Sequence, residues 1–167
     1  SSDSSLWAGP VTFSTLCIEN APYLENFDNS FPNCFSQTSN DIFNWTLNSG
    51  TTASTATGPT DDITGGGDYI YIEASAPRVP DDSAVLYSPF IDKSSLTNSK
   101  LTFYSHMYGT SIGTLKIDVS DDGGSTYSTI YSKSGDQGDQ WNFETVSLAG
   151  FSDTLRFKIS ATVGDDG

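Results

Sequence analysis

Basic side chains are scarce in this sequence, and a long apolar segment is missing altogether. Only seven Lys and Arg residues accompany 21 Asp and Glu residues, which gives a net charge of −14. Such a charge repels phosphate backbones and anionic lipid headgroups, so we expect no nucleic acid partner. No apolar run approaches the roughly 18 residues that a membrane helix requires, so we also expect no membrane insertion.

Catalytic groups are equally few. His106 is the only histidine, and the sequence contains no Gly-x-Ser-x-Gly elbow, no His-Glu-x-x-His zinc motif and no phosphate-binding loop. A glycosidase needs only two carboxylates, but no acidic pair here lies in an aromatic, cleft-like context. We therefore predict that the protein is not an enzyme, and we interpret His106 as a structural residue at a sheet edge.

Aromatic residues, in contrast, are abundant. Ten Phe and eight Tyr contribute to the 13% of aromatic residues in a chain of 167, a length that suits one domain with one core. No stretch of ten or more residues has a helical period, and Ser, Thr and Gly are frequent, so we predict an all-β fold. We assign residues 1–10 to a flexible N-terminal arm and residues 11–167 to the β-domain.

The stretch 101–120 contains the clearest strand pattern. Apolar and polar residues alternate over 102–107 and again over 114–119, which predicts two strands that each bury one face. Residues 109–113 supply the small residues of a turn, so we predict that the two strands form a hairpin. Further strands are expected at 11–18, 23–28, 41–46, 69–75, 84–89, 125–132, 142–148 and 154–161, with a long polar loop at 48–67.

Two acidic, glycine-containing loops are candidates for cation binding. Calcium takes oxygen ligands at irregular geometry, and Asp61, Asp62 and Thr64 lie in a Gly-rich loop that could supply them. The rival segment 121–125 is interpreted as an ordinary turn that its aspartates cap. The alternative is that the acidity only keeps the protein soluble.

The sequence has two cysteines, Cys17 and Cys34. A pair of cysteines in a small β-domain suggests a disulfide, while two free buried thiols remain the alternative. Trp45 is expected in the core, and Trp141 is expected to close the end of the sandwich.

Four motifs in this sequence resemble, in the same order, those of the MAM domain family. They are Phe27-Asp28 ahead of Cys34; Gly58-Pro59 with Asp62, Thr64 and the strand 69–75; the run 103–109 with Ile112-Gly113-Thr114-Leu115; and the run 134–141 that ends in Trp141. The resemblance covers residues 17–167. It implies a jelly-roll β-sandwich of two antiparallel sheets, used outside cells as a secreted or surface module for adhesion or recognition. Neighbouring domains of a larger protein and a protein or glycan ligand are the partners it implies.

The resemblance also implies specific sites. It pairs Cys17 with Cys34 in a disulfide and places a structural Ca²⁺ ion between Asp28, Asp62 and Thr64. The family usually adds an aspartate from one more strand after a turn like 164–167, and this sequence lacks that strand. The Asp-rich and Ser/Thr-rich loops resemble those of secreted bacterial members.

A carbohydrate-binding module attached to a secreted polysaccharide-degrading enzyme is the alternative function, because jelly rolls often bind glycans through exposed aromatic rings. The rings that could form such a platform are those of Tyr69, Tyr71, Tyr104, Tyr108 and Trp141. Two or more exposed, coplanar rings on one face would favour glycan binding over adhesion, and buried rings would disfavour it. A pure spacer domain is a third interpretation.

Overall fold

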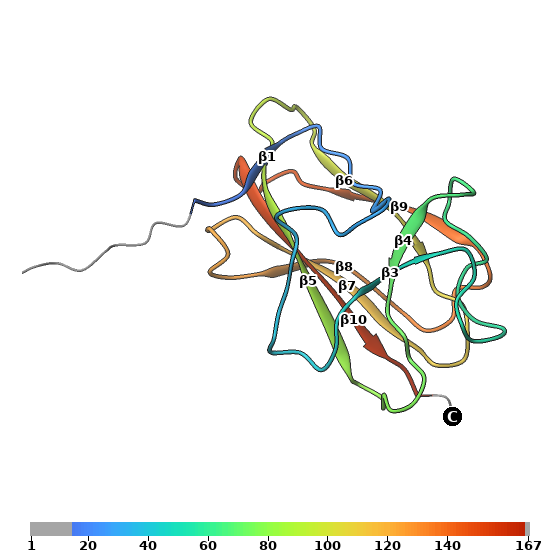
Figure 1. Cartoon of the computed structure of the whole chain (residues 1–167). Helices are drawn as coiled ribbons and strands as arrows, with labels where there is room; N and C mark the ends of the chain where they lie inside the picture. Colours follow the sequence, from blue (N-terminus) through green and yellow to red (C-terminus); the bar gives the residue numbers. More distant parts are fainter. Residues whose placement is uncertain (1–14, 166–167) are drawn as a thin grey trace, which may run out of the picture.

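The computed structural model describes residues 15–165, which form ten strands and no helix (Figure 1). The all-β prediction is therefore confirmed, while the expected arm at 1–10 and the first half of the expected strand at 11–18 lie outside the described residues. Among residues 15–165 no helix is long and apolar enough to cross a membrane. The strands are β1 (Ile18–Asn20), β2 (Ser36–Gln37), β3 (Thr46–Ser49), β4 (Asp68–Tyr71), β5 (Ser83–Asp92), β6 (Lys100–His106), β7 (Ile112–Ser120), β8 (Ser128–Ser134), β9 (Trp141–Ser147) and β10 (Thr154–Val163).

The main sheet is organised around β10. Its strand order is β1-β5-β10-β7-β8, and β2 also pairs with β5. Ile159 of β10 is paired with Leu86 of β5 on one side and with Ile117 of β7 on the other, both antiparallel. The sheet is not purely antiparallel, because β1 runs parallel to β5. In Figure 1 the three long strands β5, β7 and β10 cross the middle of the molecule.

The second layer consists of two separate strand pairs, β3–β4 and β6–β9. Ile70 of β4 packs against a core cluster that contains Trp45 and Leu86, and Phe103 of β6 packs against another that contains Val119. Both pairs therefore cover the main sheet, which makes a β-sandwich. The expected position of Trp45 in the core is confirmed.

The predicted hairpin is wrong, although both of its strands exist. β6 pairs with β9, whereas β7 pairs with β10 and β8. Phe103 of β6 packs against the cluster of Ile117 and Val119, so the two strands face each other across the core. Alternation identifies the buried face of a strand, but it does not distinguish a neighbour in the same sheet from a partner in the opposite layer.

Residues 23–28 do not form the predicted strand. Their amides bond to nearby side chains instead: Phe27 donates to Glu25 Oε1 at 2.7 Å and Asp28 to Asn26 Oδ1 at 3.2 Å. Such local bonds compete with a sheet ladder. The strands expected at 41–46 and 69–75 are also displaced or shortened, since β3 begins at Thr46 and β4 ends at Tyr71.

Candidate functional site

The carboxylate of Asp62 organises the Gly-rich loop at 61–67. Its Oδ1 accepts hydrogen bonds from the amides of Gly65, Gly66 and Gly67 at 2.8–2.9 Å, and its Oδ2 accepts from the amide and hydroxyl of Thr64. These donors, with the Thr64 hydroxyl as the largest contribution, hold the pKa of Asp62 far below its ordinary value. The side chain is therefore a carboxylate at any physiological pH.

The backbone on both sides of Asp28 is strained. Its neighbours Phe27 and Asn29 have φ angles of 61° and 68°, which non-glycine residues rarely adopt. The amide of Asp68 donates to Asp28 Oδ1 at 2.8 Å, and the amide of Asn29 donates to Asp68 Oδ2 at 2.7 Å. This reciprocal pair fixes the 26–29 loop to the first residue of β4.

The two loops meet at Gly67. A Cβ atom there would lie 2.6 Å from Asp28 Oδ1 and 2.9 Å from Asp62 Oδ2, so a side chain would clash with both carboxylates. Within residues 15–165, no salt bridge joins either carboxylate to Lys or Arg. The structure thus brings together the predicted residues Asp28, Asp62 and Thr64, whose oxygen atoms are of the kind that calcium prefers. Asp68 and Gly67 are additions that the sequence pattern did not single out.

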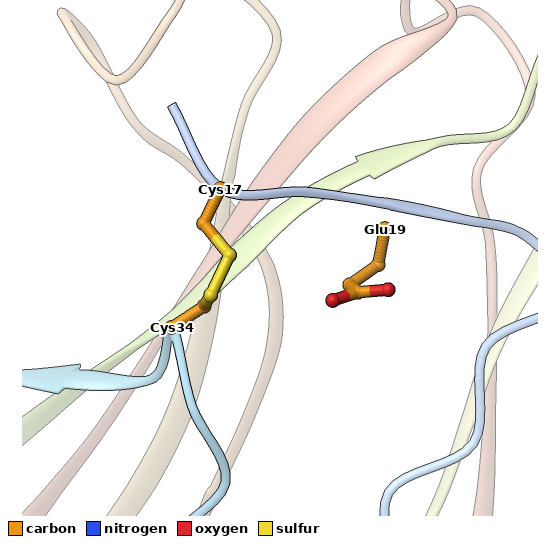
Figure 2. A group of neighbouring side chains, drawn as sticks. All are labelled: Cys17, Glu19 and Cys34. Carbon is orange, nitrogen blue, oxygen red and sulfur yellow. A yellow bond between two sulfur atoms is a disulfide. The ribbon is translucent and has the colours of Figure 1, made fainter. Parts of the chain in front are cut away.

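The disulfide and a neighbouring carboxylate form a compact group of atoms of the kind that can bind a metal ion. Cys17, Glu19 and Cys34 each place one such atom within 4.8 Å of the others, and no other trio of His, Cys, Asp and Glu in the described part of the chain does so. Figure 2 shows the two cysteines joined to each other, which confirms the predicted pairing. Metals bind thiolates, so this group is a crosslink and not a metal site.

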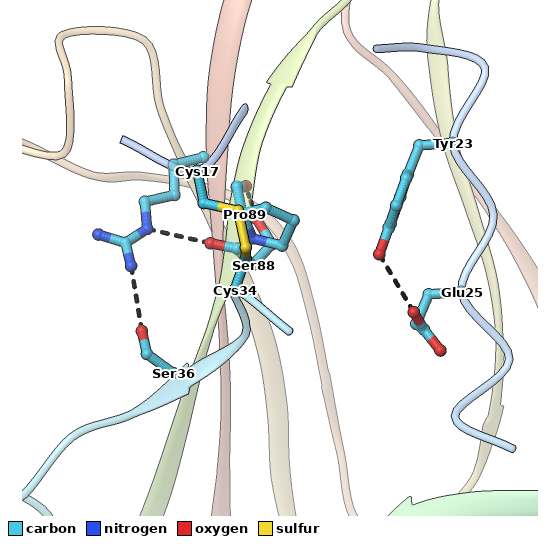
Figure 3. The surroundings of a disulfide bond; sticks show 8 residues. Cys17, Tyr23, Glu25, Cys34, Ser36, Ser88 and Pro89 are labelled. Carbon is cyan, nitrogen blue, oxygen red and sulfur yellow. Dashed lines mark hydrogen bonds between the residues drawn. A yellow bond between two sulfur atoms is a disulfide. The ribbon is translucent and has the colours of Figure 1, made fainter. Parts of the chain in front are cut away.

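The disulfide lies over the edge of the main sheet (Figure 3). The backbone carbonyl of Cys17 accepts a bond from the amide of Phe90 on β5 at 2.9 Å. Close by, the Arg156 guanidinium donates to the Ser88 carbonyl and to the Ser36 hydroxyl, both at 3.1 Å. The crosslink therefore joins the residue before β1 to the loop ahead of β2. The hydrogen bonds of Cys17 and Arg156 connect this region to β5 and β10.

The second acidic segment, at 121–125, forms the predicted turn. Asp122 Oδ1 accepts from the Ser120 hydroxyl and from the amides of Ser125 and Thr126, while its Oδ2 accepts from the Thr126 hydroxyl at 2.6 Å. These bonds, the Thr126 hydroxyl first among them, lower the pKa of Asp122 to about 2. All of these donors lie within residues 120–126.

Most of the five predicted platform rings pack against one another. Tyr69 is buried, and Trp141 lies edge-on to it at 5.9 Å and to His106 at 5.4 Å. The Trp141 indole N–H donates to the Asp61 carbonyl at 3.1 Å. Tyr71 and Tyr108 are half-buried in the same aromatic group, next to Tyr69 and His106 respectively.

The side chain of His106 is enclosed by its neighbours. Its Nε2 lies 3.2 Å from Asp139 Oδ1, and only 4% of its side chain is exposed. Burial lowers the pKa of His106, and the Asp139 carboxylate only partly opposes this effect. The imidazole is therefore mainly neutral at pH 7, and its ring packs edge-on against that of Trp141.

Among residues 15–165, the exposed aromatic rings are those of Tyr104 and of Phe143, which sequence reasoning missed. Tyr104 is 48% exposed and Phe143 59% exposed. They are paired across β6 and β9, and their rings lie 5.1 Å apart at an interplanar angle of 49°. The two rings form an open V and not a coplanar platform. Phe143 lies on the same face of β9 as the exposed Thr145 and Ser147, and this pattern could have indicated its outward orientation.

The comparison with family models agrees with the motifs. The model of the "MAM domain, meprin/A5/mu" family matches residues 26–167. The chain belongs to the MAM domain family. MAM domains are extracellular adhesion-type modules, and the disulfide of this MAM domain is consistent with that location.

Curated relatives contain the MAM domain as a small part of a long protein. The chain is 36% identical over 128 residues to MAM domain-containing glycosylphosphatidylinositol anchor protein 2 of Mus musculus, covering 68% of the chain and 14% of that protein. It is 37% identical over 109 residues to Neuropilin-1 of Xenopus laevis, covering 65% and 12% respectively. The chain thus spans only about a seventh of the length of these relatives.

A solved structure supports the fold. The K1 cleaved adhesin domain of Lys-gingipain from Porphyromonas gingivalis superimposes with a TM-score of 0.57 at 17% identity, covering 83% of this MAM domain and 94% of the adhesin domain. At this level of identity the match concerns the β-sandwich alone.

Proposed function

We propose that this MAM domain is a non-catalytic recognition module of a larger secreted or cell-surface protein, folded as a jelly roll. The family match over residues 26–167 carries the proposal. The one histidine is enclosed, with only 4% of its side chain exposed, which supports a structural role for it. The name of the murine relative states a membrane anchor, in keeping with display at a cell surface. The Asp-rich loops lead us to place the domain with secreted bacterial members.

A calcium ion held by Asp28, Asp62 and Thr64 is the second part of the proposal. The support for it is that both carboxylates approach Gly67, where a Cβ atom would lie within 3 Å of an oxygen of each. Calcium would neutralise the repulsion between them and fix the 26–29 loop to the 61–67 loop. The five protein donors that already occupy Asp62 organise the loop in advance of binding.

Excess Ca²⁺ is therefore expected to raise the melting temperature of the domain by about 5–10 °C over a chelated sample, since a ligand at about 100 times its Kd stabilises by about 2.7 kcal/mol. Asp62→Ala is expected to abolish this rise. Asp122→Ala is the matched control, because it removes a similar loop-capping carboxylate and should leave the rise intact. Differential scanning calorimetry checks all three proteins, and an unchanged wild-type melting temperature would reject the site.

Glycan binding is the alternative function, and the exposed pair of Tyr104 and Phe143 favours it. Aromatic faces stack on apolar patches of sugar rings, and two rings in a V can contact one pyranose from two sides. The packed arrangement of Tyr69, Trp141 and Tyr108 argues against the wider platform.

The double variant Tyr104→Ala/Phe143→Ala tests whether this pair is the recognition surface. If the pair is a recognition surface, binding to the cognate glycan or protein should weaken at least about tenfold, as expected for loss of aromatic anchors. Leu24→Ala, at a side chain that is 87% exposed elsewhere, should leave binding unchanged. A glycan array identifies the carbohydrate case; unchanged binding of a protein ligand by the double variant would move the recognition surface away from β6 and β9.

A further inference from the structure

An open depression of about 630 Å³ lies along the segment between β2 and β3. In Figure 1 this segment runs beside the first half of β5. The volume is within the range of about 300–1,000 Å³ that small-molecule sites occupy. The polar part of its lining comes from the end of β2, from the segment that follows and from the loop between β4 and β5: Gln37, Thr38, Ser39, Asp41, Asn44 and Arg78.

The depression lies on the outer surface of this segment. Phe43 and Trp45 are only 8% and 7% exposed and belong to a core cluster. Ile42, Asn44 and Thr46, which alternate with them, are exposed and line the depression. Successive side chains of an extended chain point to opposite sides, so the two buried rings hold the alternate side chains outward.

Both walls of the depression are fixed before any ligand arrives. The amide of Ile42 donates to the carbonyl of the first residue of β5 at 3.1 Å, and Asp41 Oδ2 accepts from the Val85 amide at 2.6 Å. The opposite wall is Arg78, whose guanidinium carbon lies 4.4 Å from the centre of the Phe43 ring. Because these contacts already order the side chains, a ligand would bind at little entropic cost.

Several polar groups of the lining have no partner within the protein. Gln37 Nε2 donates to the Trp45 carbonyl at 2.9 Å, and because a carbonyl only accepts, this bond sets the orientation of the amide. Gln37 Oε1 is buried, and no hydrogen-bond partner for it exists among residues 15–165. A buried acceptor without a partner is costly. A ligand hydroxyl in the depression would supply the missing donor.

The charges of the lining decide what class of ligand fits. Arg78 takes part in none of the ion pairs between described residues, and the Asp41 carboxylate lies in the same lining. An anion would therefore meet Asp41 as well as the net charge of −14, and a cation would meet Arg78. A neutral ligand with many hydroxyl groups avoids both penalties.

A sugar ring has this chemistry. Each hydroxyl both donates and accepts, so one ring can satisfy a guanidinium, an amide and a carboxylate at the same time. Sugars also have an apolar face, and the side chain of Ile42, which is 61% exposed, provides an apolar contact for it.

We propose that this depression binds a neutral hexose unit of a glycan, with ring hydroxyls bonded to Arg78, Asn44 and Gln37 Oε1. The site contains neither the residues of the candidate calcium site nor the pair of Tyr104 and Phe143. The inference therefore goes beyond the proposed function and depends on neither part of it.

NMR titration of the full chain with glucose, galactose and mannose tests the site. At least one hexose should shift the side-chain amide signals of Asn44 and Gln37 in a saturable way, with a Kd on the order of 1 mM for so small a ligand. Asn44→Ala should weaken this binding at least about fivefold through loss of a hydrogen bond. Asn33→Ala is the matched control, because it truncates an exposed asparagine outside the lining and should leave the Kd unchanged.

Three results would overturn the proposal. The first is the absence of any shift at Asn44 and Gln37 with all three hexoses. The second is an unchanged Kd in Asn44→Ala, and the third is tighter binding of galacturonic acid than of galactose, which would reject a neutral ligand. The Tyr104→Ala/Phe143→Ala variant should retain hexose binding in the depression, so failure of this site and failure of the recognition surface on β6 and β9 are separate results.

Discussion

Leu86→Ala is expected to lower the free energy of unfolding by about 4 kcal/mol, within the range of about 2–5 kcal/mol for truncation of a buried leucine. Leu86 has no exposed surface and lies on β5, with Gln37 of β2 opposite it on one side and Ile159 of β10 on the other. It packs in the cluster that joins the main sheet to Trp45. The change removes buried methyl groups and leaves a cavity that the sheet cannot close.

Urea unfolding monitored by tryptophan fluorescence measures this loss. Leu24→Ala is the matched control, because the same side chain is 87% exposed there and its truncation should cost less than about 0.5 kcal/mol. A loss below about 1 kcal/mol at Leu86 would mean that the two layers are not packed through β5 as described.

Removal of the disulfide is the second large effect. In Cys17→Ser/Cys34→Ser the unfolded chain regains the freedom that a crosslink over 17 positions removes, so stability should fall by about 3 kcal/mol. The structural consequence should concentrate on β1, which has only three residues and, within residues 15–165, pairs only with β5. Exchange of the Phe90 amide, which donates to the Cys17 carbonyl, should accelerate more than that of amides in β7.

Thermal melting of the double serine variant, compared with wild type in the presence of a reductant, checks this result. The two should melt at the same temperature, about 6–12 °C below the oxidised wild type. If the serine variant melts with the oxidised protein, the crosslink contributes nothing beyond the hydrogen bonds around it.

Strand positions were predictable where one face is consistently apolar. The segments expected at 84–89 and 154–161 appear as β5 and β10, each longer than its prediction by a few residues. Pairing was not predictable, as β6 and β7 demonstrate, because alternation contains no information about the partner strand. Residues 23–28 were also expected to form a strand, but side-chain acceptors such as Glu25 take the amides that a sheet would need.

The composition of the 61–67 loop already suggested cation binding, but only the family resemblance could connect that loop to Asp28. Asp28 and Asp62 lie far apart in the chain, and no spacing rule connects them. In the structure both carboxylates lie next to Gly67. Asp68 also bonds to the 26–29 loop, through its own amide and through its carboxylate. The exposed ring of Phe143 was missed because the aromatic prediction followed tyrosine and tryptophan, whereas strand register decides which rings face solvent.

The position of β10 also determines when the domain can fold during synthesis. β10 lies between β5 and β7, yet it is the last described strand to be made, and its pairs with β5 join residues as distant as Leu86 and Ile159. Until it leaves the ribosome, β5 and β7 each have an unpaired edge and β1 is attached to an incomplete sheet. Long-range pairing of this kind makes folding slow, and it exposes strand edges in the meantime. The net charge of −14 opposes association of these exposed edges before β10 arrives.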